Sequence, residues 1–116
     1  MIMCKKILII DDDLYFTRNL MEAYLKDDLS FSLADSLNRA LNLLEINDYD
    51  FILANVHVPG GCCHVLKAEL KNQKKHAQVF FMSNLDSDHF LSQEAGETCF
   101  LKKDIGEALN RVVYEI

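Results

Sequence analysis

The stretch KKILIIDDD, residues 5–13, decides the fold of this chain. Two lysines precede four consecutive aliphatic side chains, which end abruptly in three carboxylates. An apolar run of this kind predicts a strand that is covered on both faces, as at the centre of a parallel sheet. Open α/β sheets place their sites at the carboxyl ends of such strands. We therefore expect the three acids to reach the edge of the sheet where a site forms.

The length and composition indicate one globular domain that spans residues 1–116. Hydrophobic residues make up 50% of the chain and charged residues 26%, which is typical of a folded domain and not of a disordered one. The apolar residues near the start run straight into the acids, so they are no secretory signal, and no stretch is long enough to span a membrane. We expect a cytoplasmic protein that keeps four cysteines reduced, namely Cys4, Cys62, Cys63 and Cys99.

The charge of the chain narrows the class of partner. Its formal net charge is −6 at pH 7. A direct nucleic-acid partner is disfavoured, because binding to a phosphate backbone needs a basic stripe that displaces counterions. One short basic run is present, and we interpret it as the solvated end of a helix; it comprises Lys71, Lys74, Lys75 and His76. The expected partners are therefore proteins.

Strand and helix patterns alternate five times along the chain. Apolar runs and period-two alternation predict strands at 7–10, 30–33, 49–56, 77–82 and 99–101. Helical spacing predicts helices at 14–26, 36–47, 63–71, 86–96 and 105–114. Asp13 is placed to cap the first helix, and Asp35 or Ser36 the second. Proline and glycine predict a loop at 57–61.

This alternation predicts a flavodoxin-like, doubly wound parallel sheet of five strands in the order 2-1-3-4-5, with five helices. Strand–helix–strand crossovers are right-handed, and the first and third strands meet at the switch point of such a sheet. Polar side chains stand at or just past the carboxyl ends of several strands. These residues should converge on one crevice: Asp11, Asp12, Asn55, Ser83 and Lys103.

With these positions in place, the chain resembles the receiver domains of bacterial response regulators over nearly all of its length. The first strand and its acids (ILIIDDD, residues 7–13) resemble the opening of that family. So do the third strand with the turn after it (YDFILAN, residues 49–55, then Pro59-Gly60) and the hydroxyl of Ser83. The segments Glu94-Ala95-Gly96 and Phe100-Leu101-Lys102-Lys103 complete the match.

The resemblance implies a site in which an aspartate on the third strand accepts a phosphoryl group beside a magnesium ion. It implies that Asp11 and Asp12 hold the metal with the backbone carbonyl of His57, and that Ser83 and Lys103 bind the phosphoryl oxygens. Phe100 stands where many members have an aromatic switch, although a core role is also open to it. The implied partners are a histidine kinase, an output domain or a second receiver.

The departure that matters is Asn55, which stands where the resemblance implies the acceptor aspartate. An amide has no carboxylate oxygen to act as nucleophile, and its neighbour Ala54 has no hydroxyl to replace it. The loss of one negative charge should also weaken magnesium binding. The sequence therefore predicts a pseudo-receiver that is not phosphorylated, binds Mg²⁺ weakly at most, performs no catalysis and acts through protein contacts.

Two other interpretations stay open at this point. Asp11 and Asp13 have the spacing of the paired acids in haloacid-dehalogenase-like phosphatases, although Tyr15 stands where a threonine is expected. The cluster of Cys62, Cys63 and His64 contains soft ligands that suit a metal or redox sensor. Against a zinc site, the two cysteines are adjacent and do not have the usual C-x₂-C spacing.

Overall fold

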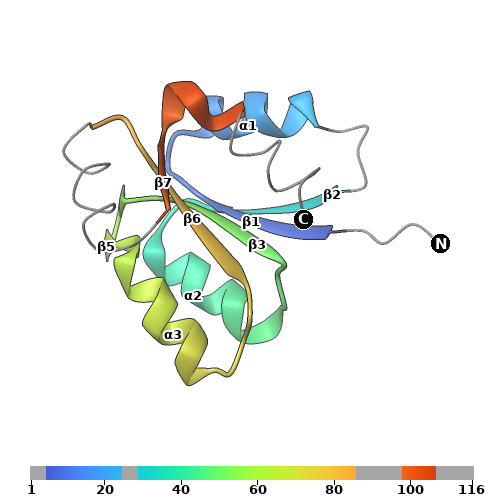
Figure 1. The fold of residues 1–116 in the computed structure, drawn as a ribbon, viewed down its shortest axis with the longest axis vertical. Coiled ribbons are helices and arrows are strands. Elements are labelled where there is room, and N and C mark those ends of the chain that lie inside the picture. Colours follow the sequence, from blue (N-terminus) through green and yellow to red (C-terminus); the bar gives the residue numbers. More distant parts are fainter. Residues whose placement is uncertain (1–4, 25–28, 86–97, 107–116) are drawn as a thin grey trace.

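The computed structural model describes residues 5–24, 29–85 and 98–106, and its centre is a parallel sheet of five strands (Figure 1). The strand order is β2-β1-β3-β6-β7, and all four pairings are parallel. The strands are β1 (Lys5–Ile10), β2 (Leu29–Ala34), β3 (Phe51–Asn55), β6 (Gln78–Ser83) and β7 (Cys99–Leu101). The predicted order 2-1-3-4-5 is therefore confirmed.

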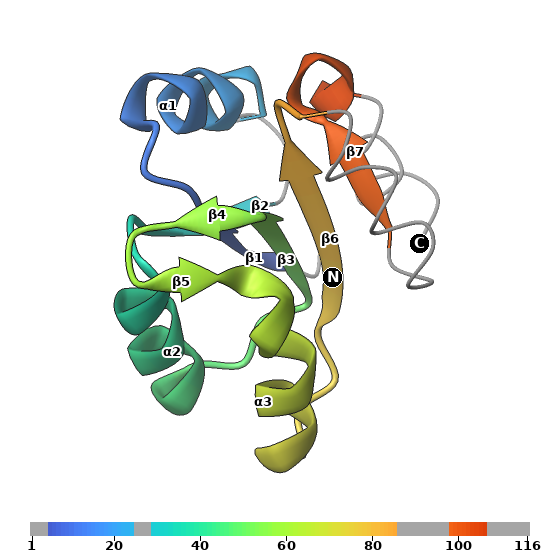
Figure 2. The ribbon, with the colours of Figure 1, turned by 90° about the vertical axis from the view of Figure 1, so that its left-hand side faces the viewer.

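Helices cover both faces of this sheet, as a doubly wound fold requires. Helix α1 (Leu14–Ala23) lies on one side of the sheet, whereas α2 (Leu37–Ile46) and α3 (Leu66–Asn72) lie on the other (Figure 2). The helix predicted at 86–96 lies outside the described residues, and of that predicted at 105–114 only 105–106 are described, as helical. None of the helices in the described ranges has the length and hydrophobicity that crossing a bilayer would need.

Strand β1 is covered on both faces of the sheet, which is why its sequence is a continuous apolar run. Leu8 and Ile10 pack into the core beneath α2 and α3, while Ile7 and Ile9 pack into the core beneath α1. All four side chains are fully buried. Burying an aliphatic side chain of this size contributes about 1.5–3 kcal/mol to stability. The buried strand therefore fixes the position of Asp11, which follows it directly.

Side-chain caps fix where the first two helices begin. The carboxylate of Asp13 accepts a hydrogen bond from the Phe16 amide at 3.0 Å, as predicted. Ser36, one of the two candidates, caps α2, since its hydroxyl accepts a hydrogen bond from the Arg39 amide at 3.2 Å. Such caps satisfy amide groups that have no partner within the helix. Because Asp13 holds α1, the chain turns immediately after Asp11.

The prediction of a loop at 57–61 was wrong in part. The segment forms a small antiparallel hairpin of β4 (His57–Val58) and β5 (Gly61–Cys62) (Figure 2). Pro59 and Gly60 make the two-residue turn, and Gly60 has a φ of 98°, which glycine adopts without strain. A 3₁₀ turn (Cys63–Val65) follows before α3, so the helix predicted from 63 starts as a tighter coil.

Candidate functional site

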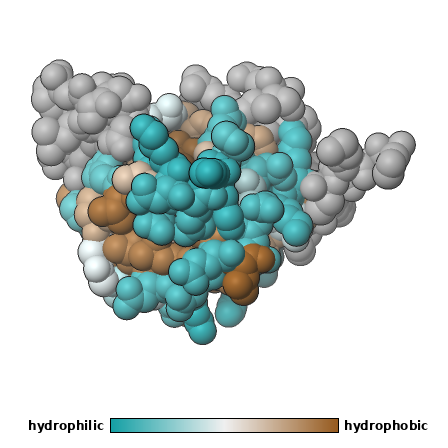
Figure 3. Space-filling view, turned by 90° about the horizontal axis from the view of Figure 1, so that it is seen from below, coloured by the Kyte–Doolittle hydropathy of each residue, from teal (hydrophilic) through white to brown (hydrophobic). Residues whose placement is uncertain are grey.

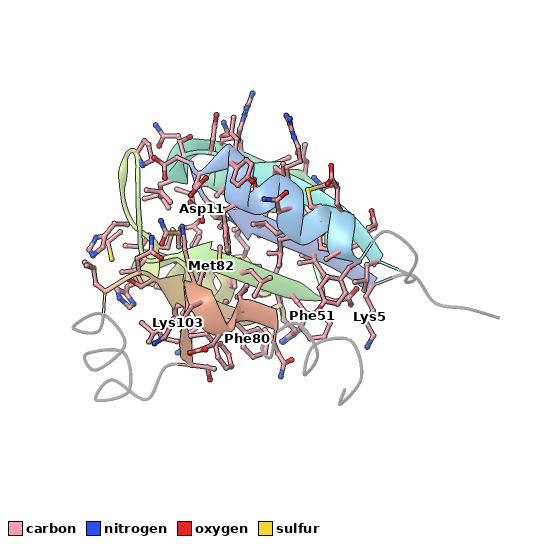
Figure 4. All side chains as sticks on the ribbon, turned by 90° about the horizontal axis from the view of Figure 1, so that it is seen from above. Lys5, Asp11, Phe51, Phe80, Met82 and Lys103 are labelled. Atoms are coloured by element: carbon pink, nitrogen blue, oxygen red, sulfur yellow. The ribbon has the colours of Figure 1, made fainter. Side chains whose placement is uncertain are left out.

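Three strands deliver polar side chains to one edge of the sheet. The register pairs Ile10 with Ala54, so the residues that follow, Asp11 and Asn55, leave adjacent strands at the same level. Asn55 is in turn paired with Met82, directly before Ser83. Figure 4 shows Asp11, Met82 and Lys103 at this edge, with Lys103 on the segment after β7. The predicted convergence of the strand ends is therefore present.

Asp11 is the buried centre of the site, and its neighbour Asp12 is exposed. The Asp11 side chain has 0% of its surface exposed. Its Oδ1 accepts a hydrogen bond from the Asp13 amide at 3.0 Å. A buried carboxylate is costly unless hydrogen bonds and a counter-charge compensate for lost hydration. The groups around Asp11 therefore decide what this site can hold.

The Asn55 amide occupies the space between two oxygen acceptors. Its Nδ2 donates to the carbonyl oxygen of His57 at 2.8 Å and to Asp11 Oδ1 at 3.5 Å. Both neighbours are acceptors only, so the amide must turn its NH₂ group toward them. These are two of the three groups that the sequence assigned to a metal ion. Asn55 thus links Asp11, which follows β1, to His57, the first residue of β4, through hydrogen bonds.

Lys102 supplies the positive charge of the site, a role that the sequence analysis had not given to it. Its Nζ lies 2.6 Å from Asp11 Oδ2, and only 8% of its side-chain surface is exposed. In the described part of the chain, Oδ2 accepts no hydrogen bond, so this ion pair is what compensates its burial. The ammonium also lies 4.8 Å from the centre of the Phe16 ring. In the sequence, the two adjacent lysines were the signal that either side chain could point toward the site.

Lys103, the predicted phosphate ligand, is exposed next to this ion pair. With Ser83 and Lys102 it lines a hollow of about 230 Å³ at the carboxyl end of β6. Ser83 is buried, and its hydroxyl accepts a hydrogen bond from the Leu85 amide at 3.0 Å. Two lysines and a hydroxyl form a surface that suits an anion. That Ser83 and Lys103 contact phosphoryl oxygens remains a prediction.

The donor set fits a resident magnesium ion poorly. Asp11, Asp12 and the His57 carbonyl offer hard oxygen ligands, which Mg²⁺ prefers. However, Asn55 donates to both Asp11 and His57, and Lys102 is paired with the second oxygen of Asp11. An incoming cation would have to displace these contacts and would meet the positive charge of Lys102. Asp11 and the His57 carbonyl therefore already have partners within the site.

Phe100, the predicted switch residue, is half-buried and packs against the core on the α1 side of the sheet. Its ring centre lies 6.4 Å from that of Phe80, which in turn lies 6.3 Å from Phe51 (Figure 4). Tilted aromatic pairs at such distances are favourable. These ring contacts support the core role considered for Phe100, whereas its role as a switch remains a prediction.

The cysteine cluster has little of the chemistry that a sensor needs. Cys63 is fully buried in the core. Burial, and to a lesser extent the nearby Cys62 and Asp11, raise the pKa of the Cys63 thiol from 9.0 to about 12. A thiolate is the form that binds metals and reacts. In the described ranges, no group of three or more histidine, cysteine or acidic side chains is arranged to hold a metal ion.

We expect the buried thiol to make the stability of the domain fall with pH above 9. Between pH 9 and 12 the unfolded chain loses the Cys63 proton while the folded chain keeps it. The free energy of unfolding should then decrease by about 1.4 kcal/mol per pH unit from this group alone. Urea denaturation at several pH values measures this slope. Cys63→Ala should remove this contribution and Cys62→Ala should keep it; equal slopes in both variants would contradict the prediction.

The paired acids of the phosphatase alternative have different environments. The Asp13 carboxylate is engaged as the cap of α1, and Asp11 is engaged by Lys102 and Asn55. Tyr15 has 80% of its surface exposed beside them. An acid that protonates a leaving group must be able to change partners during the reaction. The geometry gives no support to this alternative.

Comparison with known proteins identifies the class. The sequence matches the family of response regulator receiver domains over residues 7–112, so the chain belongs to this family. Members of the family are in general signalling domains that interact with kinases and output domains and commonly bind Mg²⁺. A search among curated proteins found no match.

Solved receiver structures share the fold. The receiver domain of the Francisella response regulator 1452 has a TM-score of 0.78 and 25% sequence identity, with 93% of each chain covered. The non-phosphorylated HemR receiver domain from Leptospira biflexa has a TM-score of 0.74 and 22% identity, covering 95% of this chain and 94% of its own. The response regulator TrrA from Thermotoga maritima, solved with Mg²⁺ and BeF, has a TM-score of 0.70 and 18% identity, with 84% of each chain covered.

Proposed function

We propose that this chain is a pseudo-receiver, which keeps the receiver fold and its docking surfaces but carries signals without accepting a phosphoryl group. The observation that carries the proposal is the Asn55 amide at the end of β3, donating to Asp11 and to the His57 carbonyl. Phosphoryl transfer needs a carboxylate oxygen as nucleophile, and an amide lacks one. Any switching must then come from a partner or ligand that binds one conformation better than another.

Magnesium has a minor part in this proposal. We expect residual Mg²⁺ binding to be weak, because Asn55 and Lys102 already engage both oxygens of Asp11. The remaining oxygen ligand would be the exposed Asp12, because the His57 carbonyl also accepts a hydrogen bond from Asn55. Cation affinity in oxygen sites follows the number of carboxylates. The domain should therefore reach its native state without a metal ion.

Protein contacts are proposed to carry the signal, and the surface beside α1 offers one place for them. Leu14 and Tyr15 at the start of α1 have 56% and 80% of their surface exposed, and Leu33 on β2 is exposed as well. Leu14 and Leu33 border a hollow of about 220 Å³, with Arg18 and Glu22 at its rim. Exposed apolar groups that cluster often mark interaction sites. A histidine kinase, an output domain or a second copy, met in the cytoplasm, would be a suitable partner.

Incubation with acetyl phosphate and Mg²⁺, followed by intact-mass analysis, tests the proposal. We expect the mass of the wild-type chain to stay unchanged, because no side chain at the acceptor position can form an acyl phosphate. Asn55→Asp is the matched positive control, since it restores a carboxylate at the end of β3. A phosphorylated wild-type species that disappears in Asn55→Ala would refute the proposal.

A further inference from the structure

A basic cluster lies on α3 and the turn after it. Residues 63–82 contain four lysines and one glutamate, although the whole chain has a net charge of −6. Lys67 and Lys71 are four residues apart on α3, so they share one face of the helix, and Lys74 lies in the turn that follows. Together with His76 they form the basic stripe, and all four residues are exposed.

The neighbouring Lys75 is not part of this stripe, because the fold already uses it. Its Nζ donates to the carbonyl oxygen of Asn47 at 2.9 Å and to that of Leu44, and it lies 3.7 Å from the Asp48 carboxylate. These contacts satisfy carbonyl groups at the end of α2, where a positive charge is favourable. Lys75 therefore anchors the turn, and the stripe is held in place beside it.

The stripe borders a hollow of about 730 Å³. Apolar side chains of Leu70, Ala77 and Val79 contribute to its lining. Its volume falls within the range of about 300–1,000 Å³ that is usual for ligand pockets. Figure 3 views the molecule from the side that carries α2 and α3, where apolar and hydrophilic areas lie next to each other. A cationic rim and an apolar lining thus occur together on one surface.

This surface is distant from the Asp11 site along the sheet. The turn that ends the stripe leads into Gln78, the first residue of β6, whereas Ser83 at the other end of β6 borders the site. Five residue steps along a strand span about 16 Å. A partner on the stripe would therefore leave the Asp11 site and the α1 surface accessible.

We propose that the basic stripe binds an acidic, amphipathic segment of a protein partner. Its carboxylates would pair with Lys71 and Lys74, and one of its apolar side chains would enter the hollow over Leu70 and Val79. A nucleic acid is a poorer match, because a long polyanion would also meet the negative charge of the rest of the surface. The inference builds on the proposed signalling through protein contacts, but it does not depend on the chemistry of Asn55.

A synthetic peptide tests this inference. The probe is a fluorescent peptide with leucine and glutamate at helical spacing, and its partner probe has glutamine in place of every glutamate. We expect the acidic peptide to bind in fluorescence anisotropy, to lose affinity as salt rises, and to shift the amide NMR signals of Lys71, Lys74 and Ala77. Lys71→Glu with Lys74→Glu should weaken binding at least about tenfold, since two attractive contacts become repulsive.

The matched control reverses two other exposed charges, Lys6→Glu with Arg39→Glu, and changes the net charge by the same amount. This variant should weaken binding by less than about twofold if the contact is local. The inference fails if neither peptide binds, if the glutamine peptide binds equally well, or if both double variants lose equal affinity. It also fails if duplex DNA or anionic vesicles bind the stripe more tightly than the acidic peptide. No phosphoryl donor is present, so these outcomes are independent of the acetyl phosphate test.

Discussion

Replacing Lys102 with methionine should lower the free energy of unfolding by about 3–5 kcal/mol, because it leaves a buried carboxylate without its counter-charge. The Lys102 ammonium lies 2.6 Å from Asp11 Oδ2, and both side chains are almost completely buried. Methionine keeps the length and the apolar stem that pack near Phe16, so the loss of stability reports the removal of the charge. Urea denaturation of both proteins at pH 7 measures the difference.

The matched control is Lys103→Met, one residue further along the chain. Lys103 is exposed, and surface substitutions usually change stability by no more than about 0.5 kcal/mol. The two variants have the same composition and net charge, so a general electrostatic effect would be equal in both. A costly Lys103→Met beside a neutral Lys102→Met would mean that Lys103 is the buried partner of Asp11.

Which of the two adjacent lysines pairs with Asp11 was not predicted from the sequence. Phe100 packs into the core on the α1 side, and strand alternation directs Lys102 to the same side, toward Asp11 and Phe16. The resemblance of Phe100-Leu101-Lys102-Lys103 to the family had assigned the phosphate-binding role to Lys103. Strand alternation was therefore the pattern that could have singled out Lys102, although Lys102 itself begins a 3₁₀ turn (Lys102–Asp104).

The sheet itself was predictable because its strongest signals are periodic. The apolar runs of β1 and β3 are long enough to be buried on both faces, and the caps Asp13 and Ser36 fix the helix starts. Strand order then follows from crossover handedness. The hairpin after β3 was missed, since a two-residue turn and a loop share the same proline and glycine. The bridging role of the Asn55 amide depends on distances between side chains, which composition and spacing do not contain.

Asn55→Asp should change a domain that is indifferent to magnesium into one that depends on it. Without metal, the new carboxylate would face Asp11 Oδ1 and the His57 carbonyl in place of the amide that now donates to both. Two like charges about 4 Å apart repel by ~4 kcal/mol at an effective dielectric of ~20, before screening. Lys102 offsets part of this repulsion. We therefore expect the variant in EDTA to be about 2–4 kcal/mol less stable than wild type.

Magnesium should restore most of this loss in the variant and little in the wild type. Three carboxylates and a carbonyl would then surround the cation, and a ligand at a hundred times its Kd stabilises the folded state by about 2.7 kcal/mol. Urea denaturation with EDTA and with Mg²⁺ gives both values. Asn55→Ala separates charge from hydrogen bonding, because it removes the amide without adding an anion and should stay insensitive to magnesium. If wild type gains as much stability from Mg²⁺ as Asn55→Asp, the amide does not block the cation, since the remaining ligands would then hold it equally well.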